Sequence, residues 1–167
     1  MEKLIEMANL QYSNQGIAEI QKIPSRWLPI RNKRGEIVSA KIEEQSTVDF
    51  IGRYIDTPIA FDAKSVLHEN KWYLRKLEPH QYEFLKKWSR GGLSFILLGF
   101  WATEEFFLLP FDYIQAKYIK WEKGGGASVK LTELKESFPV IKPGGRVVLD
   151  YLSVINAKTK LKEVALT

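Results

Sequence analysis

One stretch, residues 47–64, constrains the fold most, because it sets charged side chains among residues that belong in a core. Two apolar runs of strand character flank a turn signal at residues 56–58. The first run opens on Asp49, and the second closes on Asp62 and Lys64, which lie two residues apart and so project from one face of a strand. Such charges are rarely buried unless they are paired or hold a metal. The pattern therefore predicts either a divalent-metal site or a buried ion pair, and the residues alone leave both open.

The context of this stretch separates it from similar triplets elsewhere in the chain. An acid followed two residues later by lysine also occurs at residues 69–71 and 133–135. The first of these lies in a polar loop and the second on a predicted helical face, where charges are solvated. Only Asp62 and Lys64 complete an apolar strand.

Phosphodiester hydrolysis explains why these residue types would stand together. The reaction needs an activated water and neutralisation of charge on the phosphoryl oxygens, which Mg²⁺ supplies while bound by a few oxygen ligands. Asp49 and Asp62 would provide carboxylates, and the backbone carbonyl of Ala63 a third oxygen. Lys64 would orient the water or stabilise developing charge. A zinc hydrolase is disfavoured, because the chain has no cysteine and its two histidines are far apart in sequence.

Composition narrows the class of protein further. The 167 residues suit one ordinary domain, and 45% hydrophobic and 13% aromatic residues are globular values. The net charge of +5 is compatible with an anionic partner such as nucleic acid. No apolar run is long enough for a transmembrane helix, and the N-terminus lacks the features of a signal peptide. We therefore expect a cytoplasmic protein with no membrane partner.

Periodicity and turn signals predict an α/β chain with one mixed sheet flanked by helices, a single domain over residues 1–167. A basic turn with Arg31, Lys33 and Arg34 is predicted at the tip of a protruding hairpin, about residues 27–45, and a basic tail at residues 156–167. Strands are expected at residues 17–23, 94–100 and 106–109, and helices at residues 2–14, 78–88, 111–121, 131–138 and 149–155. The glycine-containing segment 122–128 is expected to be a loop.

Several segments, taken in order, resemble one known family. Residues 46–50 (Ser-Thr-Val-Asp-Phe) with residues 61–64 (Phe-Asp-Ala-Lys) resemble the active-site core of RecU, the Holliday junction resolvases of Firmicutes and their phages. This family belongs to the PD-(D/E)xK superfamily, which has a restriction-endonuclease-like core. The resemblance also covers the first helix, the first strand, the segments at residues 77–81 and 106–110, and the C-terminal segment at residues 145–151.

The resemblance implies roles that the residues alone did not. It implies that Asp49 and Asp62 are the metal-binding acids, that Lys64 is the catalytic lysine, and that Glu2 of the first helix helps to complete the metal site. Gln81 is similar to a glutamine that follows the site in related nucleases. The basic hairpin is similar to the stalk that RecU inserts into the junction centre. A homodimer that uses Mg²⁺, with Mn²⁺ as the other candidate, would then nick a four-way junction symmetrically in recombination and repair.

The chain departs from the family pattern at three places. Asp62 stands where members usually have glutamate, Val48 stands where a second threonine is common, and the basic N-terminal extension of bacterial members is not seen, which is more like phage members. Two alternatives are therefore kept: a nuclease of the same superfamily acting on duplex or flapped DNA, and a catalytically inactive DNA-binding relative.

Overall fold

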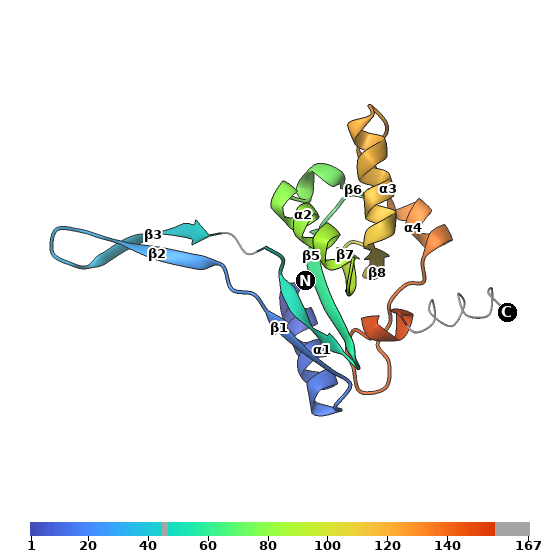
Figure 1. Cartoon of the computed structure of the whole chain (residues 1–167), viewed down its shortest axis with the longest axis horizontal. Coiled ribbons are helices and arrows are strands. Elements are labelled where there is room, and N and C mark those ends of the chain that lie inside the picture. Colours follow the sequence, from blue (N-terminus) through green and yellow to red (C-terminus); the bar gives the residue numbers. More distant parts are fainter. Residues whose placement is uncertain (45–46, 156–167) are drawn as a thin grey trace.

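The computed structural model describes residues 1–44 and 47–155, and the side chains of residues 26, 27 and 42–44 lie outside that description. A five-stranded sheet forms the centre, in the order β1-β4-β5-β7-β8 (Figure 1). Its strands are β1 (Ala18–Lys22), β4 (Phe50–Tyr54), β5 (Thr57–Val66), β7 (Leu93–Phe100) and β8 (Glu105–Pro110). β5 and β7 run parallel and the other neighbours run antiparallel, so the sheet is mixed, as the sequence predicts.

Helices cover both faces of this sheet. α1 (Glu2–Asn14) packs Ile5, Ala8 and Tyr12 against one face. α2 (Pro79–Trp88), α3 (Phe111–Glu122) and α4 (Leu131–Ser137) bury their apolar side chains on the other. The unbroken apolarity of β7 follows from this arrangement, because both of its faces are covered. The α/β fold class is therefore confirmed.

The C-terminal segment is fastened to α1 by buried hydrogen bonds. The Tyr12 hydroxyl donates to Asp150 Oδ1 at 2.9 Å, and the Tyr151 hydroxyl donates to Asn9 Oδ1 at 2.5 Å. Gly144 lies against Asp150, where an added Cβ would be 2.4 Å from a carboxylate oxygen. Within the predicted helix 149–155, residues 151–155 are helical, and the predicted tail 156–167 lies outside the described residues.

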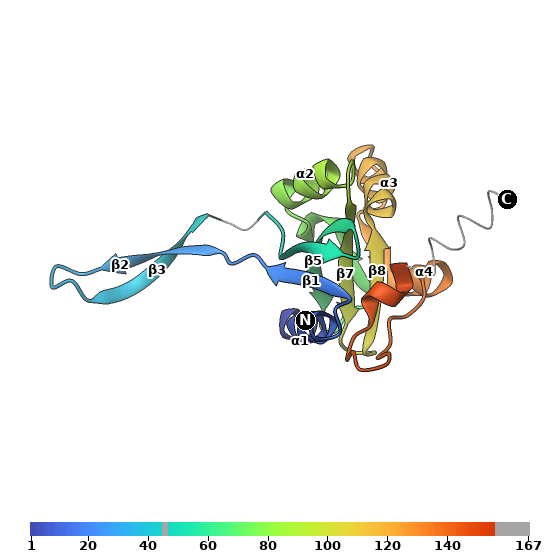
Figure 2. The ribbon, with the colours of Figure 1, turned by 60° about the horizontal axis from the view of Figure 1, so that its bottom comes forward.

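Two smaller sheets lie beside the main one. β2 (Arg26–Arg31) and β3 (Ile37–Glu44) form an antiparallel hairpin that projects far from the body of the protein, as the turn chemistry predicts (Figures 1 and 2). β6 (Lys71–Tyr73) pairs with β9 (Ser128–Lys130) on the face that carries α2 and α3. β9 is absent from the sequence prediction, which ended its loop at residue 128. Three residues after a glycine run carry too little periodicity to reveal a strand whose central residue, Val129, pairs with Trp72, 57 residues earlier.

The turn between β4 and β5 differs from the one expected. Thr57 and Pro58 already belong to β5, and the turn is made by Ile55, at φ 53°, and Asp56. A β-branched residue in the left-handed region is strained, so sequence preference alone does not place the turn there. Among the described residues, no helix is long and apolar enough to cross a membrane.

Candidate active site

The β4–β5 pairing brings the two predicted aspartates together. Phe50 pairs with Phe61, so the antiparallel register continued by one residue sets Asp49 opposite Asp62. Asp49 Oδ2 accepts a hydrogen bond from the backbone nitrogen of Ala63 at 2.8 Å. Asp62 does not end its strand, as the sequence suggested, because β5 continues to Val66. Beyond Lys64 the strand continues with Ser65, which is exposed, and Val66, which is buried in the core.

Lys64 and Gln81 close a compact hydrogen-bonded group around Asp62. Gln81 Nε2 donates to Asp62 Oδ1 at 2.8 Å, while Lys64 Nζ donates to Gln81 Oε1 at 2.9 Å. Lys64 Nζ also lies 2.7 Å from Asp62 Oδ2, where the side chains of lysine and aspartate are 16% and 0% exposed. We call Asp49, Asp62, Lys64 and Gln81 the carboxylate cluster.

The start of α2 explains how Gln81 is aimed at this cluster. Glu78 is the N-cap and Gln81 the third helical residue of a capping box, in which Gln81 Oε1 accepts from the Glu78 backbone nitrogen at 3.1 Å. Pro79 occupies the first turn, where its missing N–H is tolerated. The amide of Gln81 is thus held by its own helix and by Lys64 while it donates to Asp62. The sequence points to Gln81 only through the family resemblance.

Burial and the neighbouring carboxylate of Asp49 raise the pKa of Asp62 to about 7, and Lys64 opposes that shift. Asp62 Oδ2 is buried and lacks a hydrogen bond of good geometry, so its ion pair with Lys64 is the contact that balances it. Two adjacent carboxylates of which one is desolvated favour a bound cation, because a cation lowers their mutual repulsion. Oxygen-only donors of this kind fit Mg²⁺ or Mn²⁺.

The backbone of Ala63 fits the predicted third ligand. In a strand, the N–H and C=O of one residue point to the same side. Because the Ala63 N–H donates to Asp49, its carbonyl is directed toward the side of β5 on which Asp49 lies. The carbonyl thus faces the acid pair, not β7.

Glu2 is placed apart from these acids. Its Oε2 lies 2.6 Å from Lys22 Nζ, which also contacts Glu6 Oε1 at 3.0 Å, and the hydrogen bonds that Lys22 donates to the two glutamates raise its pKa. Within the described ranges, no three acidic or histidine side chains gather closely enough to hold a metal ion. Lys22 pairs with Phe50, the residue after Asp49, so Glu2 lies at the same end of the sheet. Its role as a ligand stays a prediction.

The tip of the hairpin carries the predicted cations in an ordered turn. Asn32 Oδ1 accepts from the backbone nitrogens of Arg34 and Glu36 at 2.8 and 3.1 Å, and Gly35 has φ 81°. Arg31 Nη1 donates to the Gly35 carbonyl at 2.8 Å. Lys33 and Arg34 are exposed, and neither forms an ion pair with any described residue. The turn therefore presents positive charge at the far end of the hairpin.

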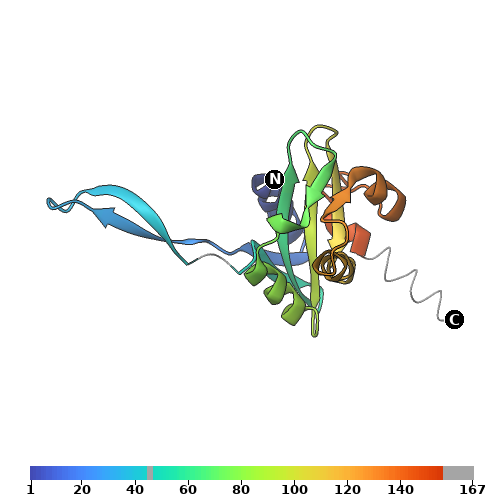
Figure 3. The ribbon, with the colours of Figure 1, turned by 90° about the horizontal axis from the view of Figure 1, so that it is seen from above.

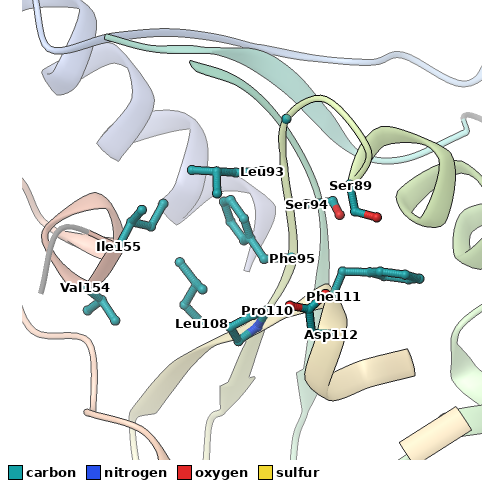
Figure 4. Close-up of a pocket in the computed structure, with 11 residues that line it drawn as sticks. Ser89, Leu93, Ser94, Phe95, Leu108, Pro110, Phe111, Asp112, Val154 and Ile155 are labelled. Atoms are coloured by element: carbon teal, nitrogen blue, oxygen red, sulfur yellow. The ribbon is translucent and has the colours of Figure 1, made fainter. Parts of the chain in front are cut away.

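A separate pocket of about 280 Å³ lies between β7, β8 and the C-terminal helical turn (Figure 4). Leu93, Phe95 and Val154 line it, and Asp112 is the one charged residue among the described residues of its wall. None of the predicted site residues borders it. It therefore has no part in the site.

The fold and the site define a class: mixed α/β proteins that set a pair of carboxylates, one of them buried, and a lysine on the central strands beside a helical glutamine, and that project a basic hairpin. Within that class, the chain belongs to the Recombination protein U (RecU) family, whose model matches residues 1–157. The observations that point to the family, the acid pair and the hairpin, both lie inside the matched range.

Two bacterial relatives agree with this assignment. The chain is 32% identical over 161 residues to the Holliday junction resolvase RecU of Streptococcus pneumoniae, covering 92% of this chain and 80% of the relative. It is 27% identical over 165 residues to the protein of the same name from Lactobacillus delbrueckii subsp. bulgaricus, covering 93% and 77%. A solved structure of the Holliday junction resolvase Hjc from Archaeoglobus fulgidus aligns with a TM-score of 0.38 and 13% identity, over 66% of this chain and 74% of that one.

Proposed function

We propose that this protein is a metal-dependent endonuclease that resolves four-way DNA junctions. The observation that carries the proposal is the carboxylate cluster, in which a fully buried Asp62 faces Asp49 and is bridged by Lys64 and Gln81. Membership of a family whose relatives are named Holliday junction resolvases supports the choice of substrate. A cytoplasmic location stays a prediction.

Each member of the cluster has a distinct task in this proposal. Asp49, Asp62 and the Ala63 carbonyl would hold Mg²⁺ or Mn²⁺, which supplies a polarised water and neutralises charge on the phosphoryl oxygens. Lys64 holds its ammonium beside Asp62, where it orients the attacking water and stabilises the charge that develops on the phosphate. Gln81 fixes both Asp62 and Lys64, so neither side chain has to reorganise during the reaction.

The hairpin and the oligomeric state complete the proposal. Arg31, Lys33 and Arg34 would contact phosphates near the junction centre, because clustered cations on a projecting element suit backbone contact. Two symmetric nicks need two active sites, so we propose that the active form is a homodimer. Glu2 would add its carboxylate to the metal site after it leaves Lys22.

One assay tests the proposal: the purified protein and Mg²⁺ are incubated with a four-way junction, a linear duplex and a flap of the same sequence. We expect paired symmetric nicks in the junction alone, and no cleavage by Asp49→Asn, which should still bind the junction. Cleavage of the duplex or flap would assign a different nuclease substrate. Junction binding without cleavage by the parent protein would show an inactive relative.

The hairpin has its own test. Replacing Arg31, Lys33 and Arg34 together by glutamine should weaken junction binding and flatten its salt dependence, because each lost phosphate contact lowers the slope of log K against log salt by about 0.9. Asn32 and Gly35 are kept, so the turn retains its hydrogen bonds. Unchanged affinity would remove the hairpin from the DNA interface.

A further inference from the structure

The outer face of the small β6–β9 sheet carries an unusual pairing of like charges. Lys71 and Lys130 stand directly opposite each other in the antiparallel register. Trp72 and Val129, the next residues on each strand, are fully buried, so the alternation of the strands turns both lysines outward. Like charges in directly opposed positions destabilise a sheet. An anion bound between them would reverse that penalty.

More cations surround this pair. Tyr73 follows Lys71 on the same face, and its ring lies 5.0 Å from Lys71 Nζ and 4.9 Å from the guanidinium carbon of Arg75. Lys76, next to Arg75 at the end of a 3₁₀ helix at residues 74–76, is exposed. We call Lys71, Arg75, Lys76 and Lys130 the basic strand patch.

Acidic residues do not neutralise the basic strand patch. No carboxylate among the described residues forms an ion pair with any of its four cations, and Glu69 interacts with Lys71 only at longer range. Lysines on the neighbouring helices behave differently: Lys117 pairs with Glu133, and Lys135 with Glu105. The patch is therefore a cationic surface, and its charges are available to an anionic partner outside the protein.

The patch is also tied closely to the carboxylate cluster. Lys76 precedes Gln81 by five residues, which limits the backbone separation to about 18 Å. Trp72 of β6 and Val129 of β9 pack in the same core cluster as Leu85 of α2, and Figure 3 shows the green β6 and orange β9 arrows next to each other. Since one turn of duplex DNA advances about 34 Å, a duplex cut at the carboxylate cluster would reach Lys76, the patch residue nearest to Gln81 in sequence, within about half a turn.

We propose that the basic strand patch binds the phosphate backbone of a duplex arm, about half a helical turn from the cleaved bond. This inference rests on the proposed function and adds a second DNA contact to it, distinct from the hairpin. A duplex fits better than a single strand, because the patch has one aromatic ring, Tyr73, and cations already lie over it. Binding of single strands relies on successive open aromatic faces.

The test uses full-length protein carrying Asp49→Asn, so that junction binding is measured without cleavage. Lys71→Gln and Lys130→Gln are combined, and the matched control combines Lys142→Gln and Arg146→Gln, which removes the same charge from exposed positions on the C-terminal segment. The patch variant should lower junction affinity about tenfold and the salt slope by about 1.8, and the control should change neither. Equal effects of the two pairs, or none from the patch pair, would overturn the inference.

Two further measurements keep the result specific. Hydroxyl-radical footprinting should show backbone protection about half a turn from the cut site that disappears only in the patch variant; protection that persists would refute the placement.

The melting temperature of the patch variant should equal or exceed that of its parent, since the like-charge pair is removed; a lower value would show a structural role instead. Junction cleavage by the protein without substitutions tests the proposed function separately. The junction affinity of the patch variant tests the patch even if the protein does not cleave.

Discussion

Two clusters that each hold two carboxylates and one lysine lie at the same end of the central sheet, and the carboxylate cluster adds Gln81. In the carboxylate cluster, Asp62 is fully buried and Lys64 nearly so. In the surface cluster, which we define as Glu2, Glu6 and Lys22, every side chain is 40–48% exposed. Water screens the second set and not the first, so equal numbers of charges produce very different energies. We therefore expect catalysis at the carboxylate cluster, where the charges are desolvated.

The largest expected difference is in catalysis. Asp62→Asn should lower junction cleavage by more than about 10³-fold, because it removes a carboxylate from the ion and from Lys64. The measurement is single-turnover cleavage with Mg²⁺ at saturating protein. Asp56→Asn, at an exposed aspartate of the β4–β5 turn, is the control and should cleave normally. Retention of cleavage by Asp62→Asn to within tenfold would remove it from the active site.

The same substitution should stabilise the metal-free protein. Because the pKa of Asp62 is raised to about 7 from its ordinary 3.8, the folded state binds a proton that the unfolded state has lost between those pH values. Folding stability from this group therefore falls as pH rises toward 7 and stays low above it. Asp62→Asn removes that penalty.

Thermal melts in EDTA should therefore show Asp62→Asn melting higher than the parent, on the order of several degrees at pH 8 and less at pH 5. Adding Mg²⁺ should raise the melting temperature of the parent and leave the variant unchanged. A gap that stays constant with pH would show that Asp62 is not the titrating group.

A smaller effect is expected at Gln81, which touches both Asp62 and Lys64 without being charged. Gln81→Ala should reduce cleavage about 10- to 100-fold, in the range of residues that orient metal ligands. Gln81→Glu preserves the capping contact but adds a third negative charge, so it should lower the Mg²⁺ concentration needed for half-maximal rate. Equal Mg²⁺ dependence in the parent and Gln81→Ala would show that Gln81 does not position Asp62.

The two clusters also differ in how far the sequence reveals them. Asp62 and Lys64 could be predicted because the two-residue period of a strand places them on one face of an apolar run. Gln81 could be found only through the family resemblance, since its contact with Asp62 spans 19 residues. The pairing of Glu2 with Lys22 and the facing lysines of β6 and β9 follow from tertiary register, which no local pattern encodes. Local propensity predicted most of the helices and strands but missed β9.

The smallest effect belongs to the surface cluster, and it decides the role of Glu2. Lys22→Ala should change the free energy of unfolding by less than about 1 kcal/mol, because exposed ion pairs contribute little. If Glu2 joins the metal site, Glu2→Gln should lower cleavage at least tenfold, and Glu6→Gln, which also contacts Lys22, should not. Lys22→Ala should then leave cleavage unchanged or slightly raise it, since Glu2 no longer has to leave its partner. Equal cleavage by Glu2→Gln and Glu6→Gln would show that both glutamates serve only the surface cluster, and that the carboxylate cluster acts without a carboxylate from α1.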